Sequence, residues 1–191
     1  MRVVIGPYPK GDRDRKISVR IDKYDTWSMD STLAYIILPM LKQLQKDKHG
    51  APYTDDEDVP VKLRSTSAPK KKNEYDTDKY HFKRWDWILG EMIWAFSQQN
   101  TDWEDKYCSG KHDMLWQALD KDNNPIGKPR KLSAKKTKEE KQLQKDNQLM
   151  YTMVKGPKHT FKIDHKKRDA HWARMQNGFR LFGKYYTHLW D

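Results

Sequence analysis

The stretch that decides the fold is TDKYHFKRWDWILGEMIWAFSQQN, residues 77–100. One series of apolar side chains recurs in it at intervals of three and four: Phe82, Trp85, Leu89, Met92 and Phe96. A second series of aromatic and charged side chains lies on the nearly opposite face: Tyr80, Arg84, Trp87, Glu91 and Trp94. The spacing predicts a helix that begins near Asp76 or Thr77. With aromatic side chains on both faces, this Trp-rich helix is expected to lie at the centre of the fold.

Two other segments have helical spacing and flank the central one in the sequence. Residues 28–48 predict a helix that begins near Ser28 or Asp30, ends before Gly50 and is kinked at Pro39. Asp164 caps a last predicted helix with one apolar stripe: Trp172, Met175, Phe179, Phe182, Tyr186 and Leu189. Gly178 and Gly183 interrupt this last helix, and each predicts a place where another element approaches closely.

The remaining elements are a charged helix and several short strands. Residues 133–155 predict a charged helix of low amphipathicity at the periphery. Alternation of apolar and polar residues predicts a hairpin from residues 2–5 and 17–22. Turn residues predict a second hairpin from residues 114–119 and 126–132. Together with a short strand near residues 160–163, these elements predict an α+β fold, with a small antiparallel sheet and three or four helices.

Length and composition favour one folded domain over residues 1–191. The chain has 38 Lys and Arg against 27 Asp and Glu, a net charge of +11, and only 36% hydrophobic residues, figures that alone lean toward disorder. Aromatic residues make up 12% of the chain, however, and large aromatic side chains bury enough area for a compact core. The Pro-, Lys- and Asp-rich residues 50–76 are expected to form a long exposed connection.

Missing motifs favour a binding protein over an enzyme. The chain has no Gly-rich phosphate loop and no Gly-x-Ser-x-Gly elbow, and its single cysteine, Cys108, excludes an internal disulfide and a Cys-rich zinc site. No cofactor is expected. Weak metal-ligand candidates are Asp78, His81 and His165. The acidic run at residues 55–58 lacks the alternating ligand positions of a calcium loop and is read as a solvated loop.

Basic residues gather in three segments. Residues 10–20, 128–145 and 155–168 each contain several Lys and Arg and few acidic residues. Such clusters bind anions by Coulomb attraction and bind nucleic acid by counterion release. The alternative is an ordinary solvated surface.

Aromatic side chains beside cations define the candidate ligand-binding residues. They come from a strand end and helix start, from the central helix and from the last helix: Arg20, Lys23, Tyr24, Trp27, Arg84, Trp87, Glu91, Trp94, Arg174 and Tyr185. Aromatic rings stack on planar bases while cations meet phosphate. In the competing interpretation, Trp87 and Trp94 pack against another helix and Arg84 pairs with Asp22, Asp25 or Glu91.

Four segments carry a resemblance to a known family. They are VIGPY (4–8), RIDKYDTWSMD (20–30), KHGAPYTDDEDVP (48–60) and HFKRWDWILGEMIWAF (81–96). With them the chain resembles a family of uncharacterised proteins of tailed bacteriophages. The resemblance implies a viral gene product that acts in the host bacterial cytoplasm, and it brings no catalytic residue. Residues 9–15 replace a longer Trp-rich stretch of that family, so a role of that stretch does not transfer.

The leading hypothesis is a non-enzymatic phage protein that binds a phosphate-bearing ligand with a planar base. The ligand is nucleic acid, or a free or signalling nucleotide of host defence. One alternative is protein interaction, as a virion component or as an inhibitor of a host protein, because Trp, Tyr and Arg favour binding hot spots. A second alternative is a metal-dependent hydrolase. No membrane association is expected, and sparse aliphatic residues favour a dimer.

Overall fold

The computed structural model describes residues 1–7, 10–11 and 14–190. The chain is of the α+β class, as predicted. Its contacts gather into two compact units. The helical unit comprises Met1–Trp103 and Asp169–Asp191, and the sheet unit comprises Glu104–Arg168. No helix in the described part of the chain is both long and apolar enough to cross a bilayer.

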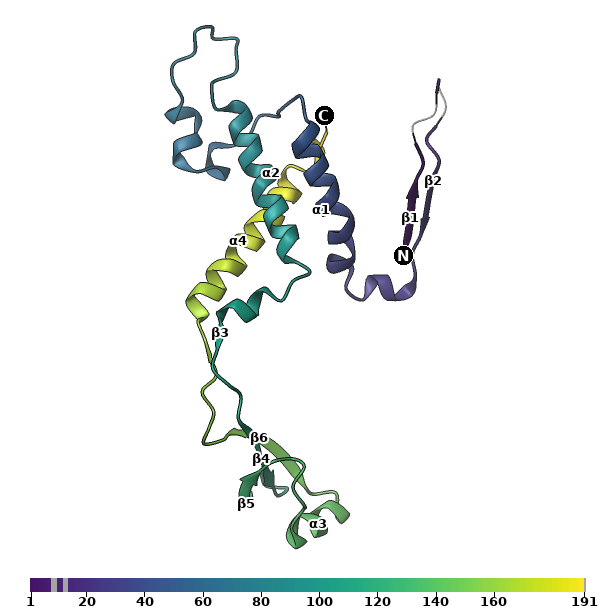
Figure 1. The fold of residues 1–191 in the computed structure, drawn as a ribbon, viewed down its shortest axis with the longest axis vertical. Helices are drawn as coiled ribbons and strands as arrows, with labels where there is room; N and C mark the ends of the chain where they lie inside the picture. The colour runs from purple at the N-terminus through teal and green to yellow at the C-terminus, as the bar shows by residue number, and fades with distance from the viewer. Residues whose placement is uncertain (8–9, 12–13, 191) are drawn as a thin grey trace. The chain divides into compact units, whose positions relative to one another are not determined.

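Three helices build the core of the helical unit (Figure 1): α1 (Met29–Asp47), α2 (His81–Gln98) and most of α4 (His165–Lys184). Helix α2 is the central element predicted from its two aromatic series. Trp85, Ile88, Leu89 and Met92 are 0% exposed, and they belong to the same hydrophobic cluster as Ala34 and Leu41 of α1 and Leu181 of α4. The apolar stripe of residues 77–100 therefore supplies the centre around which this unit packs.

Helices α2 and α4 come close at Gly178. A Cβ atom on residue 178 would lie 2.7 Å from the Glu91 carbonyl oxygen and closer still to the Ala95 side chain. On one side of this contact, the Phe96 ring meets the rings of Phe179 and Phe182 edge to face, at centroid distances of 5.1 and 5.0 Å. The close approach predicted at Gly178 is thus confirmed. The one predicted at Gly183 is wrong, because a Cβ there has no neighbour within 4 Å.

The connection between α1 and α2 is less exposed than predicted. It contains three 3₁₀ turns, Asp56–Asp58, Val61–Leu63 and Ser65–Ser67, and it buries Asp58 and Val59. Helix α2 holds it in place from two positions. The His81 Nε2 atom lies 2.9 Å from the Ala51 carbonyl oxygen, and Arg84 donates to the Leu63 carbonyl oxygen at 3.0 Å.

The N-terminal hairpin forms in the predicted place. Strands β1 (Arg2–Ile5) and β2 (Ile17–Arg20) pair antiparallel, with Val3 opposite Val19 and Ile5 opposite Ile17. Alternation therefore puts these four apolar side chains on one face of the hairpin. That face is largely exposed, with Ile17 and Val19 at 64% and 57% exposure.

The sheet unit contains a three-stranded antiparallel sheet in the order β5-β4-β6. Its strands are β4 (Met114–Leu119), β5 (Pro125–Arg130) and β6 (Met150–Lys155), gathered with helix α3 (Lys138–Lys145) in Figure 1. A two-residue ladder joins β3 (Cys108–Ser109) to β7 (Lys162–Ile163). The predicted hairpin of residues 114–132 is confirmed.

The predicted helix over residues 133–155 is wrong for its second half. Helix α3 ends at Lys145, and Asn147 has a positive φ of 54°, which turns the chain back toward the sheet. Residues 150–155 then pair with β4 over six positions. The cross-strand partners of Tyr151 and Val154 are Ala118 and Leu115, so packing against β4 favours a strand where local composition favoured a helix.

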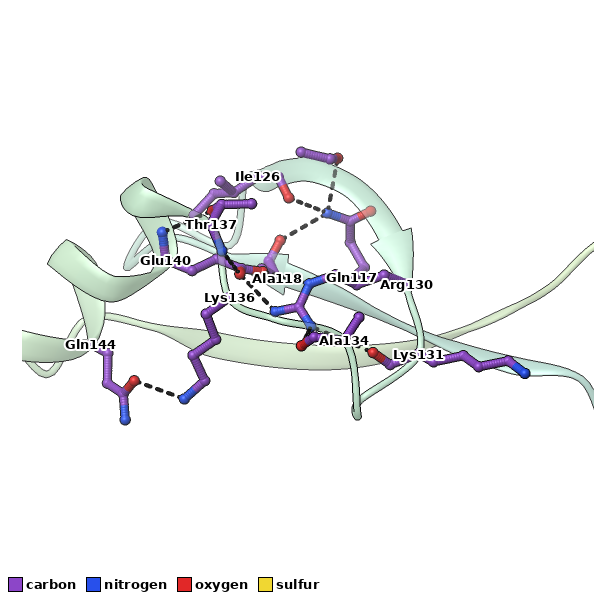
Figure 2. Close-up of polar contacts among 11 residues, drawn as sticks. Gln117, Ala118, Ile126, Arg130, Lys131, Ala134, Lys136, Thr137, Glu140 and Gln144 are labelled. Atoms are coloured by element: carbon purple, nitrogen blue, oxygen red, sulfur yellow. Dashed lines mark hydrogen bonds and ion pairs between the residues drawn. The ribbon is translucent and has the colours of Figure 1, made fainter.

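A single buried carboxylate links α3 to the sheet (Figure 2). Glu140 is 3% exposed and accepts from Arg130 of β5, with Nη2 to Oε2 at 2.6 Å. Glu140 also closes a capping box with Thr137 at the start of the helix. Burial alone would raise the pKa of this carboxyl, but the Arg130 guanidinium and the Thr137 amide hold it below its ordinary value.

We predict that Gly178→Ala lowers the free energy of unfolding by about 1–3 kcal/mol, because the added methyl forces α2 and α4 apart. The matched variant Gly183→Ala, on an exposed site of the same helix, should raise it by about 0.5–1 kcal/mol. Urea unfolding followed by tryptophan fluorescence measures both, since seven of the eight tryptophans lie in the helical unit. Equal effects of the two variants would contradict the close approach.

Candidate nucleic-acid interface

Arg84, one of the predicted ligand-binding residues, makes its polar contacts inside the helical unit. Its side chain is 5% exposed and pairs with Asp78, which lies one turn before α2 begins. It also donates to the Leu63 carbonyl oxygen. The predicted partners Asp22, Asp25 and Glu91 are therefore wrong, because Arg84 pairs with Asp78 instead.

Three of the predicted ligand-binding residues contact one another: Glu91, Trp94 and Arg174. Arg174 of α4 donates to both oxygens of Glu91 on α2, at 2.9 and 2.8 Å. Its guanidinium carbon lies 3.9 Å from the centre of the Trp94 ring. This bidentate, stacked geometry stabilises the crossing of α2 and α4. It leaves the Glu91 carboxylate 8% exposed, so its two oxygens are committed to Arg174.

Tyr185 is buried and belongs to a second polar cluster, around Asp58. The Asp58 carboxylate accepts from Tyr185 Oη at 2.8 Å and from Arg180 Nη2 at 2.5 Å, and it lies 2.6 Å from Lys184 Nζ. Burial pushes the pKa of Asp58 upward, but hydrogen bonds from Lys184, Arg180 and Tyr185 hold it below its ordinary value. Burial also raises the pKa of Tyr185 to about 12.

The N-terminal candidates remain at the surface. Trp27 and Tyr24 are 87% and 73% exposed, and the Lys23 ammonium lies 4.8 Å from the centre of the Tyr24 ring. Arg20 is exposed and makes a long 3.9 Å contact with Asp22. The remaining candidate, Trp87 on α2, is 37% exposed. Of the ten predicted residues, these five and Arg174, whose side chain is 48% exposed, keep surface available to a ligand.

The metal candidates have other partners in the chain. Asp78 is ion-paired with Arg84, and the His81 ring contacts the Ala51 carbonyl oxygen. Within the described residues, the group with metal-ligand spacing is instead Asp55, Glu57 and Asp58. The Lys184 ammonium lies among these three carboxylates at 2.6, 3.2 and 2.6 Å, and so offsets part of their negative charge. The acidic run at residues 55–58, read as a solvated loop, is thus tied to α4.

Positive charge is concentrated in the sheet unit. Residues 104–168 hold seventeen Lys and Arg against nine Asp and Glu, so this third of the chain carries a surplus of eight of the total +11. All fifteen lysines of the unit are exposed. Several of its acidic groups are turned inward: Glu140 is buried, and Asp113 and Asp120 are half-buried and accept backbone hydrogen bonds. Because Glu140 is paired with Arg130 of the same unit, its burial leaves the surplus of eight positive charges unchanged.

A hollow of about 770 Å³ lies on this unit beside β4, β6 and β7. Its lining combines imidazoles, lysines and apolar side chains: His112, Met114, Met153, Lys155, His159, Phe161, Lys162, Ile163 and His165. His112 stacks on Phe161 with ring centroids 3.7 Å apart and meets His159 edge to face at 5.7 Å. The three imidazoles and two lysines come from segments that are distant in the sequence.

Backbone pairing holds those segments together. The Gly156 amide donates to the Asp113 carbonyl oxygen at 2.8 Å, and the Thr160 amide donates to the Lys111 carbonyl oxygen at 3.0 Å. Gly110 has a φ of 82°, and a Cβ there would lie 2.6 Å from the Thr160 carbonyl carbon. A residue without a side chain is needed for this approach.

This surface has the chemistry of an anion-binding site. Lysine ammonium groups and imidazole N–H groups donate to phosphate oxygens, while the His112–Phe161 pair and the methionines offer a flat and adaptable apolar floor.

Comparison with protein-family models, curated proteins and solved structures finds no match to this chain.

The residues of the hollow were missed as site residues, with the exception of His165. The basic segment 155–168 was recognised from its lysines, which was the available signal. Its approach to His112 depends on the β3–β7 ladder and on the left-handed Gly110, and the two-residue strands are too short to give a periodic pattern.

We predict that Asp58→Asn lowers the free energy of unfolding by about 2 kcal/mol or more near pH 7, because three donors lose a charged acceptor. The folded pKa of Asp58 is depressed, so its contribution is present above about pH 4 and is lost as pH falls through the folded pKa. The difference from the wild type should therefore shrink toward about pH 3. Urea unfolding at several pH values measures it.

The control is Asp102→Asn, at an exposed position of the same unit. It should leave stability within about 0.5 kcal/mol of the wild type. A pH-independent loss in Asp58→Asn would show that charge on Asp58 is not what stabilises the cluster.

Proposed function

We propose that this protein binds nucleic acid through the lysine-rich surface of its sheet unit, without catalysing a reaction. The observation that carries the proposal is the set of fifteen exposed lysines on a unit whose buried acid, Glu140, is paired internally with Arg130. Cations spread over a whole surface fit an extended phosphate backbone better than they fit a single nucleotide.

The hollow adds a place for a base. Phosphate contacts from Lys155 and Lys162 at its edge would set the position of the strand, because such contacts carry no sequence information. Phe161 and His112 then lie where an unstacked base reaches an aromatic surface. Single-stranded nucleic acid is the favoured form, since its bases are free to stack.

The resemblance to tailed-phage proteins extends the proposal to a place of action. A viral gene product with a basic unit of this kind would act on nucleic acid in the host bacterial cytoplasm. Sequestration of a signalling nucleotide is the neighbouring possibility, and it differs in one measurable property. A small nucleotide should raise the melting temperature at stoichiometric concentration, whereas an extended-strand binder responds to oligonucleotides.

We predict that affinity for a fluorescent single-stranded oligonucleotide falls steeply between about 0.05 and 0.3 M NaCl, with a logarithmic slope of about −0.7 per phosphate contact. The variant Lys155→Gln/Lys158→Gln/Lys162→Gln should weaken binding and reduce the slope by about 2. Fluorescence anisotropy on nuclease-treated protein measures both. A flat response to salt would contradict the proposal.

The matched control removes the same charge from the helical unit. Lys42→Gln/Lys46→Gln/Lys62→Gln changes three exposed lysines outside the sheet unit. It should leave affinity within about twofold of the wild type if the sheet unit is the binding surface. Equal weakening by the two triple variants would mean that net charge, and not the sheet unit, determines binding.

A second candidate function, association with a host protein, is favoured by the exposure of Trp27 and Tyr24. Exposed Trp and Tyr beside cations are the usual anchors of protein interfaces. Trp27→Ala should abolish such an association while leaving oligonucleotide affinity within about twofold of the wild type. Loss of oligonucleotide binding in this variant would instead assign the exposed aromatic residues to the nucleic-acid site.

A further inference from the structure

The N-terminal hairpin has an apolar face that its own chain leaves uncovered. Val3 and Ile5 of β1 lie opposite Val19 and Ile17 of β2, and Ile21 follows on the same side. Ile5, Ile17, Val19 and Ile21 are between 46% and 64% exposed. We call this set of five residues the apolar hairpin face.

The opposite face of the hairpin is polar by contrast. It carries Arg2, Lys16, Ser18 and Arg20 with one apolar residue, Val4. Such one-sided alternation is typical of a sheet packed on one face and solvated on the other. A two-stranded hairpin is marginally stable in water by itself, so the pattern calls for a partner on the apolar side.

The helical unit has an apolar groove of matching character. Two adjoining hollows of about 620 and 490 Å³ share Leu33 and Ile37 of α1 in their linings. α4 and the residues after it supply the other wall, with Phe179, Phe182 and Leu189. Met40 and Tyr186 on the edges are 62% and 65% exposed. We call this the α1–α4 groove.

We propose that the apolar hairpin face of one chain docks into the α1–α4 groove of a second copy, and that the apolar hairpin face of the second copy docks in the same way into the groove of the first. The lengths agree, because Leu33 to Leu44 spans about 16 Å of helix and the strand from Ile17 to Ile21 spans about 13 Å. Docking would leave Arg2, Lys16 and Arg20 facing water.

The connection that precedes α1 favours exchange between two copies over docking within one chain. Residues Lys23–Thr26 form a 3₁₀ turn, and the Asp22 amide donates to the Asp25 carboxylate at 2.7 Å. With this turn in place, the hairpin face remains exposed. The groove of the same chain is uncovered as well, with Met40 and Tyr186 at 62% and 65% exposure, and reciprocal exchange covers both surfaces while keeping this turn.

Reciprocity also meets the size that a specific dimer needs. A two-fold exchange buries two hairpin faces and two grooves, so each of these four surfaces has to supply only about a quarter of the ~1,200 Å² of a small stable interface. The dimer brings two lysine-rich sheet units into one particle. Its formation does not depend on nucleic acid, so the two proposals can fail separately.

The first test is mass by light scattering after size exclusion, on nuclease-treated protein at high salt. The wild type should have twice the 22.9 kDa mass of the chain. Ile17→Lys/Val19→Lys should have the mass of one chain with unchanged tryptophan fluorescence. Ser18→Lys, on the opposite face of the same strand, should stay dimeric. A monomeric wild type, or a dimeric Ile17→Lys/Val19→Lys variant, would overturn the proposal.

The second test identifies the surfaces in contact. In a Cys108→Ser background, a Val19→Cys chain is mixed with a Met40→Cys chain and treated with a bismaleimide. A covalent heterodimer is the expected product. If a chain that carries both cysteines cross-links only within itself and has the mass of one chain, the hairpin occupies its own groove and exchange is ruled out.

Discussion

The close approach of α4 to α2 at Gly178 is the constraint on which the helical unit depends. A side chain at this position would meet the Glu91 carbonyl oxygen and Ala95, so the crossing exists because residue 178 has none. Once the helices cross there, Arg174 reaches both oxygens of Glu91 and Phe96 meets the α4 phenylalanines. The α1–α4 groove is lined by the residues that this crossing positions.

Buried ion pairs compensate for a small apolar content. With 36% hydrophobic residues, the chain joins its elements through carboxylates that its cations satisfy: Asp58 with Arg180 and Lys184, Asp78 with Arg84, Glu91 with Arg174, and Glu140 with Arg130. Removing one partner would leave a charge uncompensated in a low-dielectric site. The consequence for function is that these four carboxylates are satisfied within the protein, and that the exposed lysines of the sheet unit outnumber its acidic residues.

Prediction from the sequence succeeded where a periodic pattern was long. The three-to-four spacing of residues 77–100 identified the central helix, alternation identified the N-terminal hairpin, and turn residues identified the second hairpin. It failed over residues 146–155, where the pairing of β6 with β4 overrides local helix propensity. For the candidate site, Arg84, Glu91 and Arg174 look like a ligand-binding set in the sequence, whereas in the structure each of them has an ion-pair partner within the chain.

The sequence by itself determined the central helix, the hairpins and the sign of the net charge. These properties follow from the types of side chain and from their spacing along the chain. The tertiary structure decided which charges remain available, because an ion pair such as Arg174 with Glu91 joins residues far apart in the chain. It also decided that the hairpin face, which alternation marked as half-buried, is exposed within a single chain. Burial is a property of what packs against a surface, and a pattern of residues does not specify that neighbour.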